Sequence, residues 1–253
     1  MQVVILAGGL GTRLSEETEK IPKPMVTIGE EPILLHLMRY YASFGHREFI
    51  IALGYKGEVI RDFFNLLASL NSGETHSINN GTLVNLTIDS KSWTVSLVDT
   101  GLDTATGGRV LKLKELLNEE FMLTYGDGLS NVDLDSLLKH HRQESKIGSV
   151  TAVRPPARFG SLTIKGNLVE RFSEKNPQDV GWINGGFFCF SKVICDYITS
   201  TSWSLEGVPL EQLVAEKELT AYQHEGFWQP MDTLRDKKTL ETIWNQGDAP
   251  WKR

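Results

Sequence analysis

The sequence predicts an α/β fold with a Rossmann-like, three-layer arrangement around a mixed, mainly parallel sheet. Short apolar runs alternate with helical patterns through the first 150 residues, which is typical of βαβ units. After residue 155 the pattern changes to β segments separated by turns, which indicates a β-rich extension. A chain of 253 residues, 40% of them apolar, is long enough to form this fold as one large domain.

Apolar segments in the first part predict buried strands, because parallel strands covered on both faces are nearly continuously apolar. Residues 33–44 carry apolar side chains at the i, i+3, i+4 spacing of a helix packed on a sheet, and Gly45 ends this pattern. Residues 56–70 and 132–143 have similar spacing and predict two further crossover helices. The predicted strands cover residues 2–6, 48–53, 95–99, 121–125 and 148–153.

Residues 71–94 are rich in Asn, Ser, Thr and Gly, so we expect a polar excursion, with a hairpin as one form of it, rather than a linker. Residues 233–245 predict a terminal helix. We expect residues 1–253 to form a single domain whose two parts are 1–155 and 156–253. In the second part, strands are predicted at 161–164, 168–173, 184–190 and 219–224.

The charge balance argues against whole classes of partner. With 26 Lys and Arg against 32 Asp and Glu, the formal charge is 26 − 32 = −6, whereas nucleic acids and anionic membranes demand a basic face. No apolar run approaches the roughly 18–20 residues of a membrane span, and no basic leader precedes the first strand. Cys189 and Cys195 lack metal-site spacing and are interpreted as core thiols. We therefore expect a cytoplasmic protein without nucleic-acid or membrane partners.

The sharpest local feature is a glycine-rich turn directly after the first predicted strand. Glycines allow a sharp turn whose amides point at one spot, and the lack of Cβ atoms lets an anion approach closely. The turn matches neither GxxxxGK[ST] nor GxGxxG, since Leu14 stands where the last glycine of the dinucleotide motif belongs. We expect a phosphate site formed by Leu6, Ala7, Gly8, Gly9, Gly11, Thr12 and Arg13.

Two cations, Arg13 and Lys23, follow the first glycines of this turn. Pro22 and Pro24 flank Lys23 and fix the local backbone, so we expect an extended segment that holds the ammonium group in place. A fixed cation suits a triphosphate. The strand, the glycines and both cations occur within 25 residues, which favours a phosphate site over a turn with incidental surface charges.

The segment GGLGTRL, followed after eight residues by Lys-Pro, resembles the signature of the sugar-phosphate nucleotidyltransferases, and the resemblance covers nearly the whole chain. Within this family, later segments are similar to the glucose-1-phosphate cytidylyltransferases. The resemblance implies transfer of a cytidylyl group from CTP to α-D-glucose 1-phosphate, giving CDP-glucose and pyrophosphate, for cell-surface deoxysugar synthesis. The segments are TGGR at 106–109, TYGDG at 124–128, RFG at 158–160, INGGFF at 183–188 and GFWQPMDTLRDK at 226–237.

Two aspartates are the candidate metal ligands. Asp127 lies between glycines at the carboxyl end of a predicted strand, where open α/β sheets bind ligands, and Asp232 follows a late strand. Two carboxylates together with phosphate oxygens form a ligand set that Mg²⁺ prefers. In the family the matching pair binds the metal, so the resemblance implies Mg²⁺ as the cofactor.

The implied reaction needs no nucleophilic side chain, because the sugar phosphate attacks the α-phosphorus and pyrophosphate leaves in line. We expect Arg13 and Mg²⁺ to neutralise charge on the leaving pyrophosphate. Lys23 would bind the α-phosphate or the sugar phosphate. The predicted catalytic residues are thus Arg13, Lys23, Asp127 and Asp232.

Residues 1–155 would bind the nucleotide, and residues 156–253 would bind the sugar and complete the metal site. Thr106, Gly108 and Arg109 are expected at the base, where Arg109 would donate to cytosine O2 and a backbone carbonyl would accept from N4. We also expect a homo-oligomer. By the resemblance, the hexose site contains Tyr125, Gly126, Gly160, Glu174, Lys175 and Asn184.

Three alternative functions compete with this interpretation. A cytidylyltransferase for another phosphorylated acceptor stays open, because the loops expected near the sugar are where the chain departs from the family. A silent binding or regulatory subunit is disfavoured, because such relatives usually lose the cation or the carboxylates. An NAD-dependent oxidoreductase is disfavoured by the missing third glycine.

Overall fold

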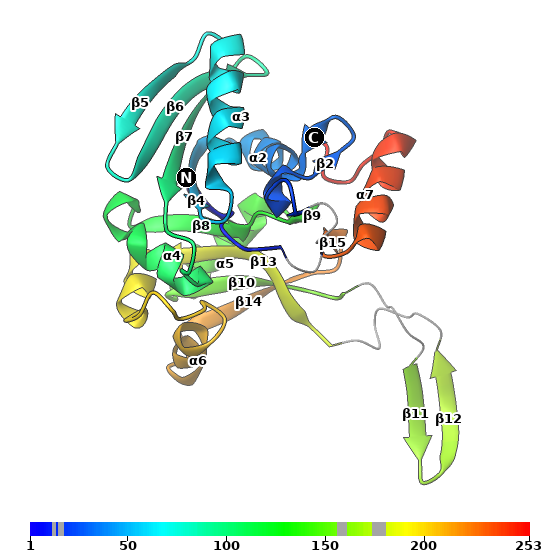
Figure 1. The fold of residues 1–253 in the computed structure, drawn as a ribbon. Helices are drawn as coiled ribbons and strands as arrows, with labels where there is room; N and C mark the ends of the chain where they lie inside the picture. Colours follow the sequence, from blue (N-terminus) through cyan, green and yellow to red (C-terminus); the bar gives the residue numbers. More distant parts are fainter. Residues whose placement is uncertain (12–13, 15–17, 156–160, 174–180) are drawn as a thin grey trace.

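A nine-stranded mixed sheet forms the centre of the structure (Figure 1). The computed structural model describes residues 1–11, 14, 18–155, 161–173 and 181–253. Across the sheet the strands follow the order β14-β10-β13-β8-β1-β4-β7-β6-β5. They are β1 (Gln2–Leu6), β4 (Glu48–Leu53), β5 (Glu74–Ile78), β6 (Gly81–Ile88), β7 (Lys91–Asp99), β8 (Glu120–Tyr125), β10 (Gly148–Val153), β13 (Ile183–Ser191) and β14 (Leu219–His224).

The sheet is mainly parallel, as predicted. β1 pairs in parallel with β4 and β8, β4 pairs in parallel with β7, and β10 pairs in parallel with β14. The polar excursion forms a hairpin of β5 and β6, and β6 extends the sheet antiparallel to β7. Because the carboxyl ends of β1 and β8 lie side by side, the loops after these strands meet at one edge of the sheet.

The second part of the chain is not a simple extension of the sheet. β13 lies antiparallel between β8 and β10, in the interior of the sheet, because Phe187, Phe188 and Phe190 are buried on both of its faces. By contrast, β11 (Ser161–Lys165) and β12 (Leu168–Ser173) form a separate antiparallel pair that extends away from the sheet (Figure 1).

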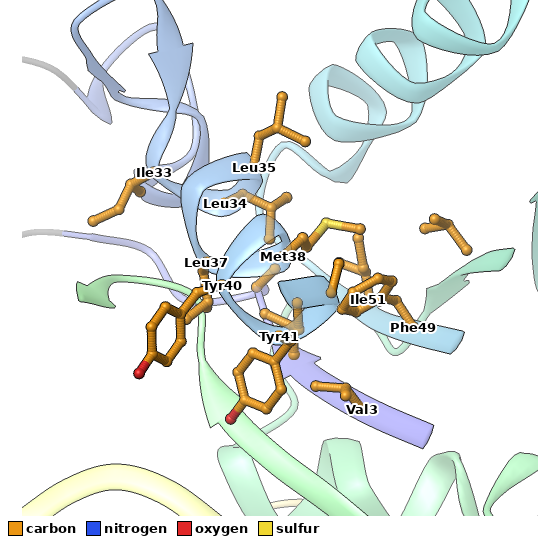
Figure 2. Packing of buried hydrophobic residues seen from close by; sticks show 14 of the residues in the cluster. Val3, Ile33, Leu34, Leu35, Leu37, Met38, Tyr40, Tyr41, Phe49 and Ile51 are labelled. Atoms are coloured by element: carbon orange, nitrogen blue, oxygen red, sulfur yellow. The ribbon is translucent and has the colours of Figure 1, made fainter. Parts of the chain in front are cut away.

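Helices cover both faces of the sheet, which gives the predicted three layers. Val3 of β1 points to one core, shared with α2 (Ile33–Ser43), α3 (Gly57–Leu70), α5 (Leu134–Glu144) and α7 (Leu234–Gln246). Figure 2 shows side chains of α2, among them Met38 and Tyr41, packed over β1 and β4. Val4 points to the opposite core, which includes side chains of α4 (Thr106–Lys112) and α6 (Val208–Ala215).

Two small antiparallel pairs lie beside the main sheet: β2 (Thr27–Ile28) with β3 (Glu31–Pro32), and β9 (Gly128–Ser130) with β15 (Trp228–Pro230). The β9–β15 pair joins the loop after β8 to the loop before α7. Three short 3₁₀ segments complete the described elements: Lys23–Met25, Lys114–Leu116 and Lys192–Tyr197.

Both cysteines are buried and carry free thiols, as expected for core residues. Burial raises the pKa of the Cys195 thiol to about 11, so this thiol stays protonated at neutral pH. In the described segments, no helix combines the length and apolar character needed to cross a membrane.

Candidate active site

A cavity of about 700 Å³ opens at the carboxyl ends of β1 and β8. It brings together most of the described residues that the sequence singled out, from segments more than 200 positions apart. This is the edge at which open α/β sheets bind ligands. The predicted residues that line it are Leu6, Ala7, Gly8, Gly9, Gly11, Lys23, Thr106, Arg109, Tyr125, Gly126, Asp127, Asn184 and Asp232.

Lys23 lies between the two predicted metal ligands at one end of this cavity. Its Nζ is 2.6 Å from Asp127 Oδ2 and 2.6 Å from Asp232 Oδ1. Lys23 is only 8% exposed, whereas the side chains of Asp127 and Asp232 are 32% and 21% exposed. The carboxylates therefore share one cation and remain accessible from the cavity.

Backbone contacts hold the two aspartates in position. Asp127 lies in the turn between β8 and β9, and its carbonyl oxygen accepts a 2.8 Å hydrogen bond from the Met231 amide. Asp232 precedes α7, where Thr233 and Asp236 form a capping box, and Asp236 Oδ2 also accepts from the Asp232 amide at 3.2 Å. The aspartates are thus fixed by a strand pair and by a helix cap.

The local structure at Lys23 differs from the expected extended segment. Lys23 begins a single 3₁₀ turn, Lys23–Met25, and the Val26 amide donates to its carbonyl oxygen at 3.1 Å. Pro22 is extended as expected, whereas Pro24 is accommodated at the start of the turn, where a missing N–H costs no hydrogen bond. The turn nevertheless holds Lys23 in a fixed place, as expected for the extended segment.

The charge of Lys23 is stabilised by its partners. Burial opposes the charged form, but Asp127 and then Asp232 outweigh this effect, so the pKa of Lys23 is raised above its usual value. The ammonium group therefore stays charged throughout the neutral pH range. A cation already occupies the point between the carboxylates.

The glycine turn lines the cavity and leaves several amides without a protein acceptor in the described part of the chain. Ala7 donates to Ala52 O and so continues the sheet, but the amides of Gly8, Gly9 and Gly11 have no protein acceptor among the residues that the structure describes. Unsatisfied amides on adjacent residues are what an anion site requires. The turn is thus compatible with bound phosphate.

Arg109 supports this turn from behind. Its Nη2 donates to Gly8 O at 2.8 Å, and its Nη1 donates to Leu53 O at 2.9 Å and to Thr100 Oγ1 at 2.6 Å. An added Cβ on Gly8 would lie 2.3 Å from the guanidinium carbon, which explains the glycine. Protein oxygens accept from the terminal nitrogens of Arg109, so in this structure the guanidinium supports the glycine turn. The expected contact of Arg109 with cytosine O2 stays a prediction.

A chain of hydrogen bonds lines another wall. Thr106 Oγ1 donates to Glu206 Oε2 at 2.7 Å, and the Tyr125 hydroxyl donates to Glu206 Oε1. Asn184 Nδ2 donates in turn to the Tyr125 hydroxyl at 3.3 Å. Burial, followed by the charge of Glu206, raises the pKa of Tyr125, so its hydroxyl stays protonated.

The sequence does not predict Glu206 as a site residue. It lies in a polar loop before α6, and Ser204-Leu205-Glu206-Gly207 carries no pattern that marks a site. Gly108, in the TGGR segment, is the sequence feature related to this loop. An added Cβ on Gly108 would lie 2.0 Å from Thr201 O, so the glycine permits the loop before α6 to pack on α4. Gly108 is not among the residues that line the cavity.

Several predicted site residues lie outside the described part of the chain: Thr12, Arg13, Gly160, Glu174 and Lys175. Their roles stay predictions. The described part shows no group of three His, Cys, Asp or Glu side chains able to hold a metal ion. The donor set at the cation end, two carboxylates around one positive charge, nevertheless fits a hard divalent ion that takes its remaining ligands from phosphate oxygens.

Comparison with known proteins agrees with this geometry. A family model described as Nucleotidyl transferase matches residues 2–233. The chain is 46% identical to a glucose-1-phosphate cytidylyltransferase of Salmonella typhimurium, over 100% of this chain and 99% of the relative. It is 40% identical to a probable glucose-1-phosphate cytidylyltransferase of Bacillus subtilis, with the same coverage.

Among solved structures, HddC from Yersinia pseudotuberculosis has a TM-score of 0.70 and 25% identity, over 96% of this chain and 99% of that one. A second structure of HddC, in complex with GMP-PN, has a TM-score of 0.68. The match of the family model, the full-length similarity to the cytidylyltransferases and the cavity at the ends of β1 and β8 lead to one conclusion. The chain is a transferase and belongs to the nucleotidyl transferase family.

Proposed function

We propose that this enzyme transfers the cytidylyl group of CTP to α-D-glucose 1-phosphate and releases pyrophosphate. The observation that carries the proposal is one cavity lined both by the glycine turn, whose amides have no acceptor among the described residues, and by a cation site made by Lys23, Asp127 and Asp232. The choice of base and sugar rests on the similarity to the glucose-1-phosphate cytidylyltransferases.

The chain's own residues would act by positioning and by charge. In the reaction a phosphate oxygen of the sugar 1-phosphate forms a bond to the α-phosphorus, and the bond from that phosphorus to the β-phosphate bridging oxygen breaks, so pyrophosphate leaves with its electron pair. The amides of Gly8, Gly9 and Gly11 would bind phosphate oxygens. Lys23 would offset charge at the α-phosphate or at the sugar phosphate, and Arg13 would offset charge on the leaving group.

Asp127 and Asp232 would hold Mg²⁺, whose positive charge, when it is bound, would neutralise phosphate oxygens and order them for in-line displacement. No side chain forms a covalent intermediate in this proposal. Both buried thiols are protonated, because burial raises the pKa of each above its usual value, which fits a reaction without a cysteine nucleophile.

The sugar site would lie beside Tyr125, Gly126 and Asn184, which line the cavity next to the metal end. Gly160, Glu174 and Lys175 would complete it. Residues 1–155 would then bind the nucleotide and residues 156–253 the sugar within one domain. We further propose a homo-oligomer in the cytoplasm, where CTP and sugar phosphates are available and free thiols such as those of Cys189 and Cys195 persist.

The proposal is tested by measuring Mg²⁺-dependent pyrophosphate release with glucose 1-phosphate and each of CTP, UTP, dTTP, ATP and GTP. We expect release with CTP, no comparable rate with the other four, and no release once the metal is chelated. Activity confined to UTP or dTTP would remove the base assignment. Mannose 1-phosphate and galactose 1-phosphate serve as matched acceptors, and a preference for either would remove the sugar assignment.

A further inference from the structure

Glu206 is the one carboxylate lining the described cavity that is not engaged at its cation end. The other charged side chains there are Lys23, Asp127 and Asp232, which form one cluster, and Arg109, whose terminal donors bind protein oxygens. A carboxylate in a cavity for a polyanion is unfavourable unless it faces neutral donors, because like charges repel. Glu206 meets two neutral donors of the protein, Thr106 and Tyr125, and its remaining lone pairs can accept from a donor on the substrate.

The position of Glu206 is fixed by α4 and β8. Its two oxygens accept from Thr106, at the first residue of α4, and from Tyr125, at the last residue of β8. The loop that carries it is anchored as well, since Leu205 N donates to Thr106 Oγ1 at 2.8 Å and Gly108 N donates to Trp203 O at 3.2 Å. The carboxylate is held in place while the residue itself remains exposed.

The place of Glu206 along the cavity indicates which substrate group it meets. Phosphate oxygens would occupy the glycine turn and the cation end, and the sugar would lie beside Tyr125, so the flank of α4 around Thr106, to which Glu206 also binds, would take the nucleoside. Cytosine carries an amino group at C4, a neutral donor, whereas uracil carries a carbonyl acceptor at the same position. A fixed carboxylate would attract the first and repel the second.

We propose that Glu206 is the residue that selects cytosine, by accepting a hydrogen bond from its N4 amino group. This inference rests on the proposed function. It replaces the backbone carbonyl expected at N4 with a side chain, and it gives Glu206 a role that Arg109 cannot fill, because a guanidinium has no acceptor.

The test compares wild type with Glu206→Gln and Glu206→Ala, and with Glu211→Gln as a matched control on the exposed side of α6. For each protein, kcat/KM is measured with CTP and with UTP at saturating glucose 1-phosphate, together with the KM for glucose 1-phosphate. We expect the CTP-to-UTP ratio to fall by at least about tenfold in Glu206→Gln, whose amide can donate to O4. Glu206→Ala should also lower the ratio, and Glu211→Gln should not change it.

Two results would overturn the assignment. An unchanged ratio with a raised KM for glucose 1-phosphate would place Glu206 at the hexose. An unchanged ratio with equal losses for both nucleotides would make Glu206 a support for Thr106 and Tyr125 only. Binding of CTP and UTP to each variant, measured by calorimetry, gives the same ratio without turnover. Absence of turnover with CTP in the wild-type protein would contradict the proposed function, and this result is distinct from both outcomes above.

Discussion

The backbone amide of Met231 donates to the carbonyl oxygen of Asp127 at 2.8 Å, and this bond joins two segments about one hundred residues apart. It continues the pairing of β9 with β15, in which Gly128 lies opposite Pro230. The bond brings Asp232, the residue after Met231, to the same side of the cavity as Asp127. The candidate metal site therefore depends on a strand pair of only three residues on each side.

Replacing Asp232 by Asn should abolish most turnover without loss of the fold. The change removes one negative charge from the cation end, and removal of a group aimed at developing charge typically lowers kcat on the order of 10²-fold to 10³-fold. Steady-state pyrophosphate release measures kcat, and thermal unfolding reports on the fold. Asp248→Asn, at an exposed position, is the control. A variant with a near-normal rate would mean that Asp232 holds no metal.

Replacing Lys23 by Gln should strengthen the binding of a divalent ion in the absence of nucleotide. The ammonium group occupies the point between Asp127 and Asp232, so Lys23 and a metal ion compete for the same carboxylates. Removing this competing charge should lower the Kd for Mn²⁺ by at least about tenfold. Lys23→Arg, which keeps the charge, should behave like wild type.

Titration calorimetry with Mn²⁺ and nucleotide-free protein measures this effect, and Mn²⁺ should also raise the Tm of Lys23→Gln more than that of wild type. The double variant Lys23→Gln, Asp232→Asn should lose the gain. Equal Mn²⁺ affinities for wild type and Lys23→Gln would show that the lysine and the metal do not share a position.

Much of the fold could be predicted from the sequence. β1, β4, β10 and β14 have the predicted bounds, because each is a short apolar or alternating segment between clear turn residues. The position of β13 in the sheet could not be predicted from the sequence. Apolar patterning shows that a strand is buried, but it does not show which strands lie beside it. Its antiparallel insertion between β8 and β10 is a property of topology, which pairs residues far apart in the sequence.

The candidate site likewise contains residues that the sequence predicts and residues that it does not. Lys23, Asp127 and Asp232 lie in recognisable motifs, and the structure places Lys23 within hydrogen-bond distance of both aspartates. Arg109 also stood out, but sequence cannot tell whether a guanidinium faces a ligand or the carbonyl oxygens behind a turn. Glu206 has no motif, because its place in the cavity depends on a loop that packs against α4.

Replacing Gly8 by Ala should destabilise the protein more than replacing Gly9 by Ala. A Cβ on Gly8 would lie 2.3 Å from the Arg109 guanidinium, whereas a Cβ on Gly9 would meet nothing within 4 Å. Overpacking of this kind typically costs about 1–3 kcal/mol, while the change at Gly9 should alter the free energy of unfolding by about 0.5 kcal/mol or less. Urea unfolding of both variants checks the difference, and equal losses would contradict the contact.

Replacing Arg109 by Met should lower the free energy of unfolding by about 2–4 kcal/mol, because it removes several charge-assisted hydrogen bonds to protein oxygens at once. Leu53 O and Gly8 O are among these acceptors. Arg142→Met is the control, since Arg142 is 59% exposed and its ion pair with Glu120 should contribute about 1 kcal/mol or less. A change at Arg109 that reduces only nucleotide binding, with normal stability, would instead favour a base contact.

Acidification should destabilise the fold through His36. Its ring is buried, donates from Nε2 to Ile28 O at 2.8 Å and packs edge-on against Trp244, and burial lowers its pKa below 6.5. The unfolded chain therefore binds a proton more readily, and stability falls as the pH drops below about 6.5, by at most about 1.4 kcal/mol per pH unit for this group. Between pH 7.5 and 5, His36→Gln should show a shallower decline in urea unfolding; an identical slope would exclude His36 as a source.

The most direct test of the account is ³¹P NMR of wild type incubated with CTP, glucose 1-phosphate and Mg²⁺, beside the Asp127→Asn variant. We predict that the signals of both substrates give way to those of pyrophosphate and of a sugar-linked diphosphate in wild type, and persist in the variant. Formation of orthophosphate, or equal conversion by both proteins, would contradict the claim that this cavity joins a nucleotide to a sugar phosphate at a cation site built by Asp127 and Asp232.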